Sequence, residues 1–390
     1  MFDPASHPAF SAVQDPVSGT VSWHLDGAIA PVQRNLYYTN PSISGDGRWL
    51  WFAVAFPPNP QIFLARIGLD PAEPTPRWFP QAAFEDNSAA VAPSGDAAWF
   101  CTDGAVWRID AEGRVERLGG LPADLVGGRR VFSTATHLTV SADGRHLALD
   151  SRIGDTSVLS TLDLGDGTVR VLHEFQEHHN HAQFSRHDPD LLLIAKDHYR
   201  NPITGRSIHH LVRTHVVRRD GSGYRCINPG FPCRPYHGAC HEWWLADGQI
   251  AFIDYDTGVW AHDLATGVDT HLWREPLCHA HADAAGRFWC ADQSPYFWDR
   301  APCQVLLYDH TTGGRWRIHA GLPALNVPRG PWHLDPHPQF SPCGRFVVWM
   351  STARGRPEVA ITPISQFAHS QFGHGPSVDS TGAGPSFPPA

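Results

Sequence analysis

The sequence predicts an all-β protein, a seven-bladed β-propeller, from two observations. The composition includes 35 Gly, 34 Pro and 15 Trp among 390 residues, which suits many short strands joined by tight turns. A motif in which Ser, Pro or Asp precedes a turn with Asp or Gly, and then an apolar run, recurs seven times. Its spacing of roughly 40 to 60 residues is the blade period of a propeller. The copies begin at Pro41, Val91, Leu138, Ala182, His241, His281 and Pro338.

Each copy of the motif predicts a β-hairpin. The Asp-Gly pair of several copies, as at Asp46-Gly47, supplies the positive φ angles that a tight turn needs. Most copies are followed by another apolar segment and a second turn, which gives about four strands per blade. Because one blade cannot bury both of its faces alone, we expect seven stacked blades to form a single domain over residues 1–365. Residues 366–390 lack apolar periodicity and are predicted to be a flexible tail.

The charge and the apolar pattern limit the partners that we expect. The formal net charge of −9 at pH 7 argues against a general nucleic-acid binder, because such proteins carry a basic face. An acidic ligand would need a local cationic site or a bound metal. No apolar stretch reaches the length of a membrane span, so no membrane partner is expected. No signal peptide is visible, which predicts a cytoplasmic location and leaves a mature secreted form open.

Side chains that can bind a metal gather before the last copy of the motif. His333, Asp335 and His337 occupy alternate positions between prolines that keep the segment extended. Side chains alternate between faces in an extended segment, so these three are expected to point the same way. Two imidazoles and a carboxylate on one face suit a divalent metal ion, with Mn, Zn and Ca as candidates.

Histidines stand just before several other copies of the motif. Equivalent positions in successive blades converge in space, so the set is a stronger signal than any one histidine. Besides His333 and His337, the set consists of His179, His181, His241, His279 and His281.

Four strings of residues resemble those of a known family. They are His-Ala-Gln-Phe from His181, His-Glu-Trp-Trp-Leu-Ala-Asp-Gly from His241, Cys-His-Ala-His from Cys278 and Asp-Pro-His-Pro-Gln-Phe-Ser-Pro from Asp335. As a set they are similar to strings of the oligogalacturonate lyases, which are seven-bladed propellers that bind a divalent metal, typically manganese. The resemblance extends from about Gln176 to Thr362 and is weak before about residue 130.

The resemblance implies catalytic roles for residues of the central blades. His241 matches the position of the family's catalytic base, and Arg213 matches the arginine that assists this base. We expect His181 and Gln183 to line the same cavity, His181 as a catalytic group and Gln183 as a substrate contact.

The resemblance also implies the metal ligands. His279 matches a ligating histidine, and a Gln-x-x-His-x-His string of the family falls on the segment that ends at His337. His337 keeps the final histidine, Asp335 replaces the middle one, and Trp332, beside His333, stands at the Gln position. These departures retain groups that can bind metal. They leave open which metal is bound and whether the sugar is galacturonate or another uronide, such as those of ulvan or rhamnosyl-glucuronate chains.

β-Elimination of a 4-O-linked uronide would use such a set of residues. The reaction removes a weakly acidic C5 proton, and a divalent cation or Arg bound to the neighbouring carboxylate stabilises the charge that develops. A neutral His is a suitable base because its pKa lies near the working pH. Further candidates are Tyr199, Tyr236 and His198 as proton donors to the leaving oxygen, and His198, Arg200 and His281 as substrate contacts.

Two other functions are alternatives. The propeller could be a binding module for a protein or a carbohydrate, because many propellers are scaffolds. A metal-dependent hydrolase or lactonase would share the metal but would form no unsaturated product. The gathering of histidines before successive blades favours an enzyme over a module. The predicted function is therefore a metal-assisted lyase that acts on an acidic oligosaccharide or polysaccharide.

Overall fold

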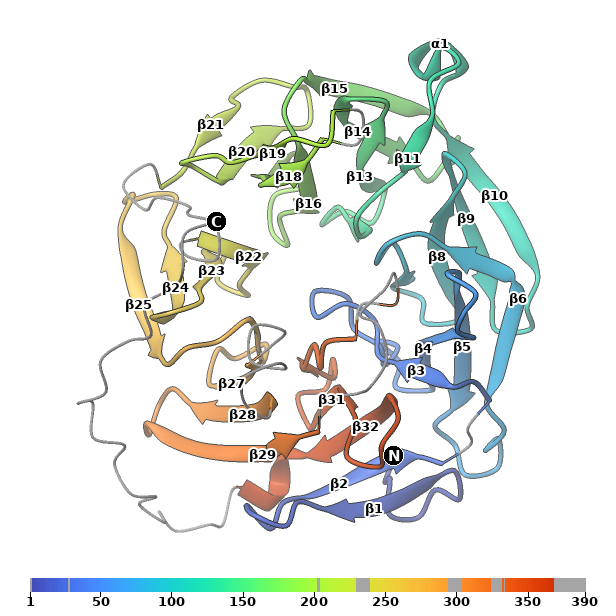
Figure 1. Cartoon of the computed structure of the whole chain (residues 1–390), viewed down its shortest axis with the longest axis vertical. Helices are drawn as coiled ribbons and strands as arrows, with labels where there is room; N and C mark the ends of the chain where they lie inside the picture. The colour runs from blue at the N-terminus through green and yellow to red at the C-terminus, as the bar shows by residue number, and fades with distance from the viewer. Residues whose placement is uncertain are drawn as a thin grey trace.

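The computed structural model describes residues 2–26, 29–201, 204–228, 239–293, 303–323, 332 and 334–367. These residues form seven antiparallel sheets in a ring, which confirms the predicted seven-bladed β-propeller (Figure 1). Each copy of the sequence motif lies where the innermost strand of a blade turns into the next strand. The blades are therefore numbered 1 to 7 by their copies of the motif. The predicted tail lies almost entirely outside the described residues.

Blades 1 to 3 follow one another along the first part of the chain. Blade 1 contains β3 (Val32–Arg34), β4 (Trp49–Ala55), β5 (Ile62–Gly68) and β6 (Arg77–Phe84). Blade 2 contains β7 (Ala90–Val91), β8 (Ala97–Thr102), β9 (Ala105–Asp110) and β10 (Val115–Gly120), and the short helix α1 (Ala123–Val126) follows it. Blade 3 contains β11 (Val131–Ser133), β12 (Thr139–Val140), β13 (His146–Ile153), β14 (Thr156–Asp163) and β15 (Val169–Phe175).

Blades 4 to 6 continue the ring. Blade 4 contains β16 (His179–Phe184), β17 (Leu191–Lys196), β20 (Thr214–Arg218) and β21 (Arg225–Cys226), with a small inserted hairpin of β18 (Tyr199–Arg200) and β19 (Ser207–Ile208). Blade 5 contains β22 (Ala239–Trp244), β23 (Ile250–Asp254), β24 (Gly258–His262) and β25 (Asp269–Arg274). Blade 6 contains β26 (His279–Ala282), β27 (Phe288–Asp292), β28 (Cys303–Asp309) and β29 (Gly314–Leu322).

Blade 7 closes the ring with strands from both ends of the described chain. Its inner strands are β30 (Gln339–Phe340), β31 (Phe346–Ser351) and β32 (Glu358–Pro363), and β2 (Val21–Leu25) and β1 (Phe10–Gln14) complete the sheet. The blue and red strands meet there in Figure 1. The Nδ1 atom of His24 on β2 lies 3.3 Å from a carboxylate oxygen of Glu358 on β32. The 3-10 helix Ile364–Phe367 follows β32. This closure was not predicted, because β1 and β2 precede the first copy of the motif.

The hydrophobic core is divided among the blade interfaces. The described residues form seven apolar clusters, and each joins two neighbouring blades. Trp51 and Phe100 lie in the cluster of blades 1 and 2, for example, and Trp243 and Trp289 in that of blades 5 and 6. Apolar burial therefore holds the blades in register and fixes the inner strands around the axis. Both helices of the described residues have four residues, far short of a membrane span.

Candidate metal centre and active site

Three histidines share an unusual backbone conformation on the inner strands. His181, His241 and His337 have φ angles of 56°, 49° and 44°, in the left-handed region that residues other than glycine rarely adopt. In each of these three blades, the first residue of the hairpin turn follows four residues after the histidine. The strand registers of β16 with β17 and of β22 with β23 shift at this point. β-Bulges of this kind re-aim a side chain, and these turn the imidazoles towards the centre of the ring.

The same position carries histidine in blades 3 and 6. These residues are His137 and His279, so five of the seven blades present an imidazole here. The rings gather around Tyr37 and Tyr38, which follow β3. Ring centroids of Tyr37 lie 5.4 Å from His137, 5.9 Å from His181, 6.2 Å from His279 and 5.0 Å from His337, and Tyr38 lies 6.2 Å from His241. His137 was not predicted, although its offset from the third copy of the motif identifies it.

His279, Asp335 and His337 form a buried triad with metal-binding geometry. One ligand atom from each lies within 4.8 Å of those from the other two. The Nδ1 atom of His279 lies 3.1 Å from both carboxylate oxygens of Asp292, which leaves its Nε2 atom for a metal. Asp292 also accepts a hydrogen bond from the backbone N–H of His337, and the Asn35 amide donates to the His337 carbonyl at 2.7 Å. The triad is therefore held from blades 1, 6 and 7.

The electrostatics of this triad favour a cation. Burial alone would lower the pKa of His279, but the Asp292 carboxylate, through its charge and its hydrogen bond, and the charge of Asp335 outweigh burial and raise this pKa. Two imidazole ligands and one carboxylate ligand fit Mn or Zn, and the second carboxylate, that of Asp292, orients the His279 ring. Ca, which takes mainly oxygen ligands, fits this donor set less well.

His241 lies beside the triad with one ring nitrogen already committed. Its Nδ1 atom donates a hydrogen bond to the Cys278 carbonyl at 2.5 Å, so its Nε2 atom carries the lone pair. The ring stacks on His279 with centroids 4.2 Å apart. Cys278, His241 and His279 also satisfy the distance limit for metal ligands. That alternative would use the same His279 and has no carboxylate ligand, so the triad with Asp335 and His337 is the better site for Mn or Zn.

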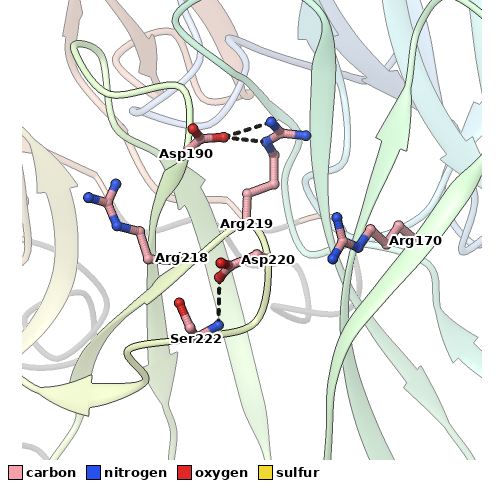
Figure 2. A pocket seen from close by; sticks show the side chains of 6 residues that line it. All are labelled: Arg170, Asp190, Arg218, Arg219, Asp220 and Ser222. Carbon is pink, nitrogen blue, oxygen red and sulfur yellow. Dashed lines mark hydrogen bonds and ion pairs between the residues drawn. The ribbon is translucent and has the colours of Figure 1, made fainter.

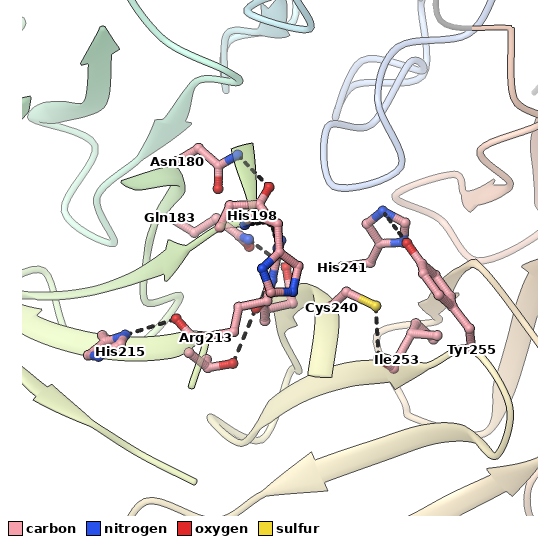
Figure 3. A network of polar contacts seen from close by, with 12 residues as sticks. Asn180, Gln183, His198, Arg213, His215, Cys240, His241, Ile253 and Tyr255 are labelled. Carbon is pink, nitrogen blue, oxygen red and sulfur yellow. Dashed lines mark hydrogen bonds and ion pairs between the residues drawn. The ribbon is translucent and has the colours of Figure 1, made fainter. Parts of the chain in front are cut away.

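Arg213 is buried in an ion-pair network between blades 4 and 5 (Figure 3). Its guanidinium pairs with Asp197 and lies 2.6 Å from Glu242, which also accepts from the Thr214 hydroxyl. Burial opposes its charge, but Asp197 and Glu242 outweigh burial and raise the pKa of Arg213. The assisting role implied by the resemblance stays a prediction, because this charge is already compensated within the protein.

Gln183 and His281 use their polar atoms between blades. Gln183 donates to the Glu242 carbonyl at 2.6 Å, and His281 Nδ1 accepts from the Phe340 backbone N–H at 3.1 Å. Burial lowers the pKa of His281 to about 3, so the ring is neutral. These contacts give both residues a structural task. His181 instead lies in the central group, which is the set of histidines gathered around Tyr37 and Tyr38. Burial lowers the pKa of His181 well below the usual value.

The other predicted residues lie on the small inserted hairpin or outside the described chain. His198 accepts from the His210 backbone N–H, and the Tyr199 ring lies near His178 and under Arg152. Arg200 is exposed and donates to the Gly205 carbonyl. No hydrogen bond or ring contact between described residues joins these three to His241 or to the triad. Tyr236 and His333 are outside the described residues.

Sequence reasoning missed a second buried arginine, Arg34 at the end of β3. It donates to the Asn35 carbonyl at 3.3 Å and to the Asn87 amide oxygen at 3.0 Å, and it forms no ion pair with any described residue. Burial lowers its pKa to about 10, against the nearby charges of Asp86 and Asp335. The guanidinium is therefore protonated at neutral pH and has no carboxylate partner of its own in the described chain.

A separate polar cavity of about 420 Å³ lies away from the central group, between blades 3 and 4 (Figure 2). Its charges are partly neutralised, because Arg219 pairs with Asp190 at 2.6 Å and Arg218 pairs with Asp188 at 2.7 Å. It contains none of the predicted site residues. Its lining consists of Arg170, Asp190, Arg218, Arg219, Asp220 and Ser222.

Two of the solved structures to which this chain is similar are oligogalacturonate lyases. An oligogalacturonate lyase in complex with manganese has a TM-score of 0.73 and 17% sequence identity, over 91% of this chain and 96% of that one. An oligogalacturonate lyase from Vibrio parahaemolyticus has a TM-score of 0.73 and 15% identity, over the same shares of both chains. No protein-family model and no curated protein sequence matches the chain. The structures thus bear out, at the level of the fold, the resemblance found in the sequence, and this protein has the fold of the oligogalacturonate lyases.

Proposed function

We propose that this protein is a metal-assisted lyase that cleaves 4-O-linked uronic acid glycosides by β-elimination and releases an unsaturated uronide. The observation that carries the proposal is the position of His241, whose lone pair on Nε2 lies beside the His279, Asp335 and His337 triad. The shared fold with the two lyase structures supports the same reading. The expected substrate is an acidic oligosaccharide or polysaccharide.

The residues divide into base, metal ligands and anion binder. His241 Nε2 takes the C5 proton, while the hydrogen bond to Cys278 holds the ring in the tautomer that this task needs. A divalent cation on His279, Asp335 and His337 would stabilise the negative charge that develops at the uronate carboxylate. Arg34 is suited to hold a carboxylate, because it is a buried cation with no ion pair among the described residues.

The test is formation of the unsaturated product, followed by its ultraviolet absorbance, with a panel of uronide oligomers. Purified protein is assayed with added Mn or Zn and with a chelator. Growth of the absorbance that the chelator suppresses would support a metal-assisted lyase. A flat trace from protein that contains metal, with new reducing ends released, would instead indicate hydrolysis. Protein that neither takes up metal nor acts on any oligomer would indicate a binding module.

The decisive variant is His241→Ala. Loss of the general base is expected to lower kcat by about 10²- to 10⁴-fold. Because His241 is not in the preferred triad, the metal content and the melting temperature should stay close to those of the unmodified protein. His279→Ala is the matched control, since it should lose metal and activity together. Turnover of His241→Ala near that of the unmodified protein would remove His241 from the role of base.

A further inference from the structure

Tyr255 lies within reach of the proposed base. It stands in the turn between β23 and β24, and its hydroxyl oxygen is 3.5 Å from His241 Nε2 (Figure 3). The two ring centroids are 5.6 Å apart, and both side chains are half-buried. Because His241 Nδ1 donates to the Cys278 carbonyl, Nε2 is an acceptor and the Tyr255 hydroxyl is the donor between them.

We propose that Tyr255 is the catalytic acid that protonates the leaving oxygen. We propose further that the substrates are uronides whose C5–H and C4–O bonds lie on the same face of the sugar ring, such as 4-O-linked glucuronides. This inference rests on the proposed lyase function and deepens it, because it names the proton donor and the class of sugar.

His241 and Tyr255 together account for every proton that moves in the reaction. His241 Nε2 takes the C5 proton, and the electron pair of the C5–H bond forms the C4–C5 double bond. The C4–O bond breaks, and the leaving oxygen takes the proton of the Tyr255 hydroxyl. Tyr255 is then a phenolate beside a protonated His241. Transfer of the proton from Nε2 back to the Tyr255 oxygen restores both groups, so one proton has moved from C5 to the leaving oxygen.

The short distance between the two atoms decides the stereochemistry. If the C5–H and C4–O bonds pointed to opposite faces, as in a galacturonide, the base and the acid would have to stand on opposite sides of the sugar. Groups 3.5 Å apart approach from one side. In a glucuronide the C5 proton and the C4 oxygen lie on one face, so neighbouring groups can serve both. The geometry therefore points to elimination from a single face.

The other described tyrosine predicted as a donor is placed differently. Tyr199 contacts His178 and His210 on the inserted hairpin side of blade 4, and its ring lies under Arg152. Tyr37 and Tyr38 are fully buried, and the Tyr38 hydroxyl donates to the Glu242 carbonyl at 3.5 Å. Tyr255 combines partial exposure with direct contact to the base.

The experiment uses the metal-loaded full chain and its Tyr255→Phe variant, with Tyr308→Phe on β28 as the matched control. Glucuronide and galacturonide oligomers of equal length are compared first. A glucuronide whose O4 carries a nitrophenyl group is the second probe, because nitrophenolate leaves without a proton. Melting temperatures and bound metal are measured for each variant to establish that the fold is retained.

We expect cleavage of the glucuronide oligomer and little or none of the galacturonide. Tyr255→Phe should lower kcat on the oligomer by about 10²- to 10⁴-fold with a small change in KM. The same variant should keep most of its rate on the nitrophenyl probe, and Tyr308→Phe should behave as the unmodified protein. His241→Ala should lose both reactions, because each needs the base.

Preference for the galacturonide, or an equal loss of both reactions in Tyr255→Phe, would overturn the inference and leave the lyase function standing. A nearly full rate of Tyr255→Phe on the oligomer would also overturn it. Absence of any unsaturated product from every uronide with metal present would refute the proposed function itself. The two failures are therefore distinguishable.

Discussion

Two buried arginines on different sides of the ring show how differently the propeller uses charge. Arg213, between blades 4 and 5, is enclosed by two carboxylates, Asp197 and Glu242. Arg34, between blades 1 and 2, meets only a carbonyl and an amide oxygen among the described residues. A buried charge without a counter-charge carries a desolvation penalty that two neutral hydrogen bonds offset only in part. The first arginine is therefore a structural element, and the second is suited to receive an anion.

The same contrast extends to the carboxylates. Asp197 has its counter-charge in Arg213, which lowers its pKa although burial opposes this. Asp150 in blade 3 forms no ion pair with a described residue, and its oxygens accept from Thr136 and from the Ala182 backbone N–H. Burial raises the pKa of Asp150 to about 7, more than its hydrogen bonds lower it. Arg34 and Asp150, in blades 1 and 3, thus form no ion pair with a described residue, whereas Arg213 and its two carboxylates neutralise one another between blades 4 and 5.

The largest expected effect is on Arg213. Replacement by Gln would leave Asp197 and Glu242 buried without their counter-charge, which is expected to destabilise the fold by about 3–5 kcal/mol. Chemical denaturation of the variant measures this loss. The exposed Arg200→Gln is the control and should change stability by less than about 0.5 kcal/mol. Unchanged stability of the Arg213 variant would show that its ion pairs are not structural.

Arg34→Gln should have the opposite profile. Removing an unpaired buried cation is expected to leave the stability unchanged or slightly higher, because no carboxylate loses a partner. Binding of glucuronate should weaken by roughly 10- to 100-fold, since hydrogen bonds to charged groups contribute about 1.5–3 kcal/mol. Calorimetry with glucuronate and with uncharged glucose measures the difference. Equal weakening for both sugars would contradict a role in binding the carboxylate, and Arg34→Lys should restore part of the preference.

The last expected effect is the change of stability with pH that comes from Asp150. Its pKa in the folded protein is about 7, above the usual value near 4 in the unfolded chain. The contribution of Asp150 to the free energy of unfolding is therefore fully present below pH 4, where its carboxyl is neutral in both states. This contribution falls as the pH rises towards 7, by at most about 1.4 kcal/mol per pH unit. Asp150→Asn should remove this slope, as denaturation at several pH values will show. A slope that persists in the variant would assign it to another group.

Local patterns in the sequence predicted the fold well because each blade repeats the same hairpin. The polar turns and the apolar runs after them are short-range features, and they marked all seven blades, three of them with an Asp-Gly pair. The convergence of His181, His241, His279 and His337 followed from their equal place in the repeat. The alternate spacing of Asp335 and His337 likewise brought both to one triad.

The residues that the sequence analysis did not predict depend on contacts that the repeated motif does not indicate. Arg34 and Tyr37 precede the first copy of the motif, so their approach to the centre depends on ring closure. Tyr255 stands in an ordinary turn after its hairpin, and only the fold places its hydroxyl near His241. The repeat also did not show that Gln183 Nε2 and His281 Nδ1 form hydrogen bonds to neighbouring blades, and the substrate contacts expected of both residues stay predictions.

The closure of blade 7 by β2 and β32 also determines when the site can exist. The residues that meet there, such as His24 and Glu358, are 334 positions apart in the chain. On a ribosome, six blades can be made before the strand that locks them emerges. Contacts over such a span form slowly, because a long loop must close first. The ring of the nascent protein therefore stays open until β32 has been made, and the candidate site is assembled in one late step.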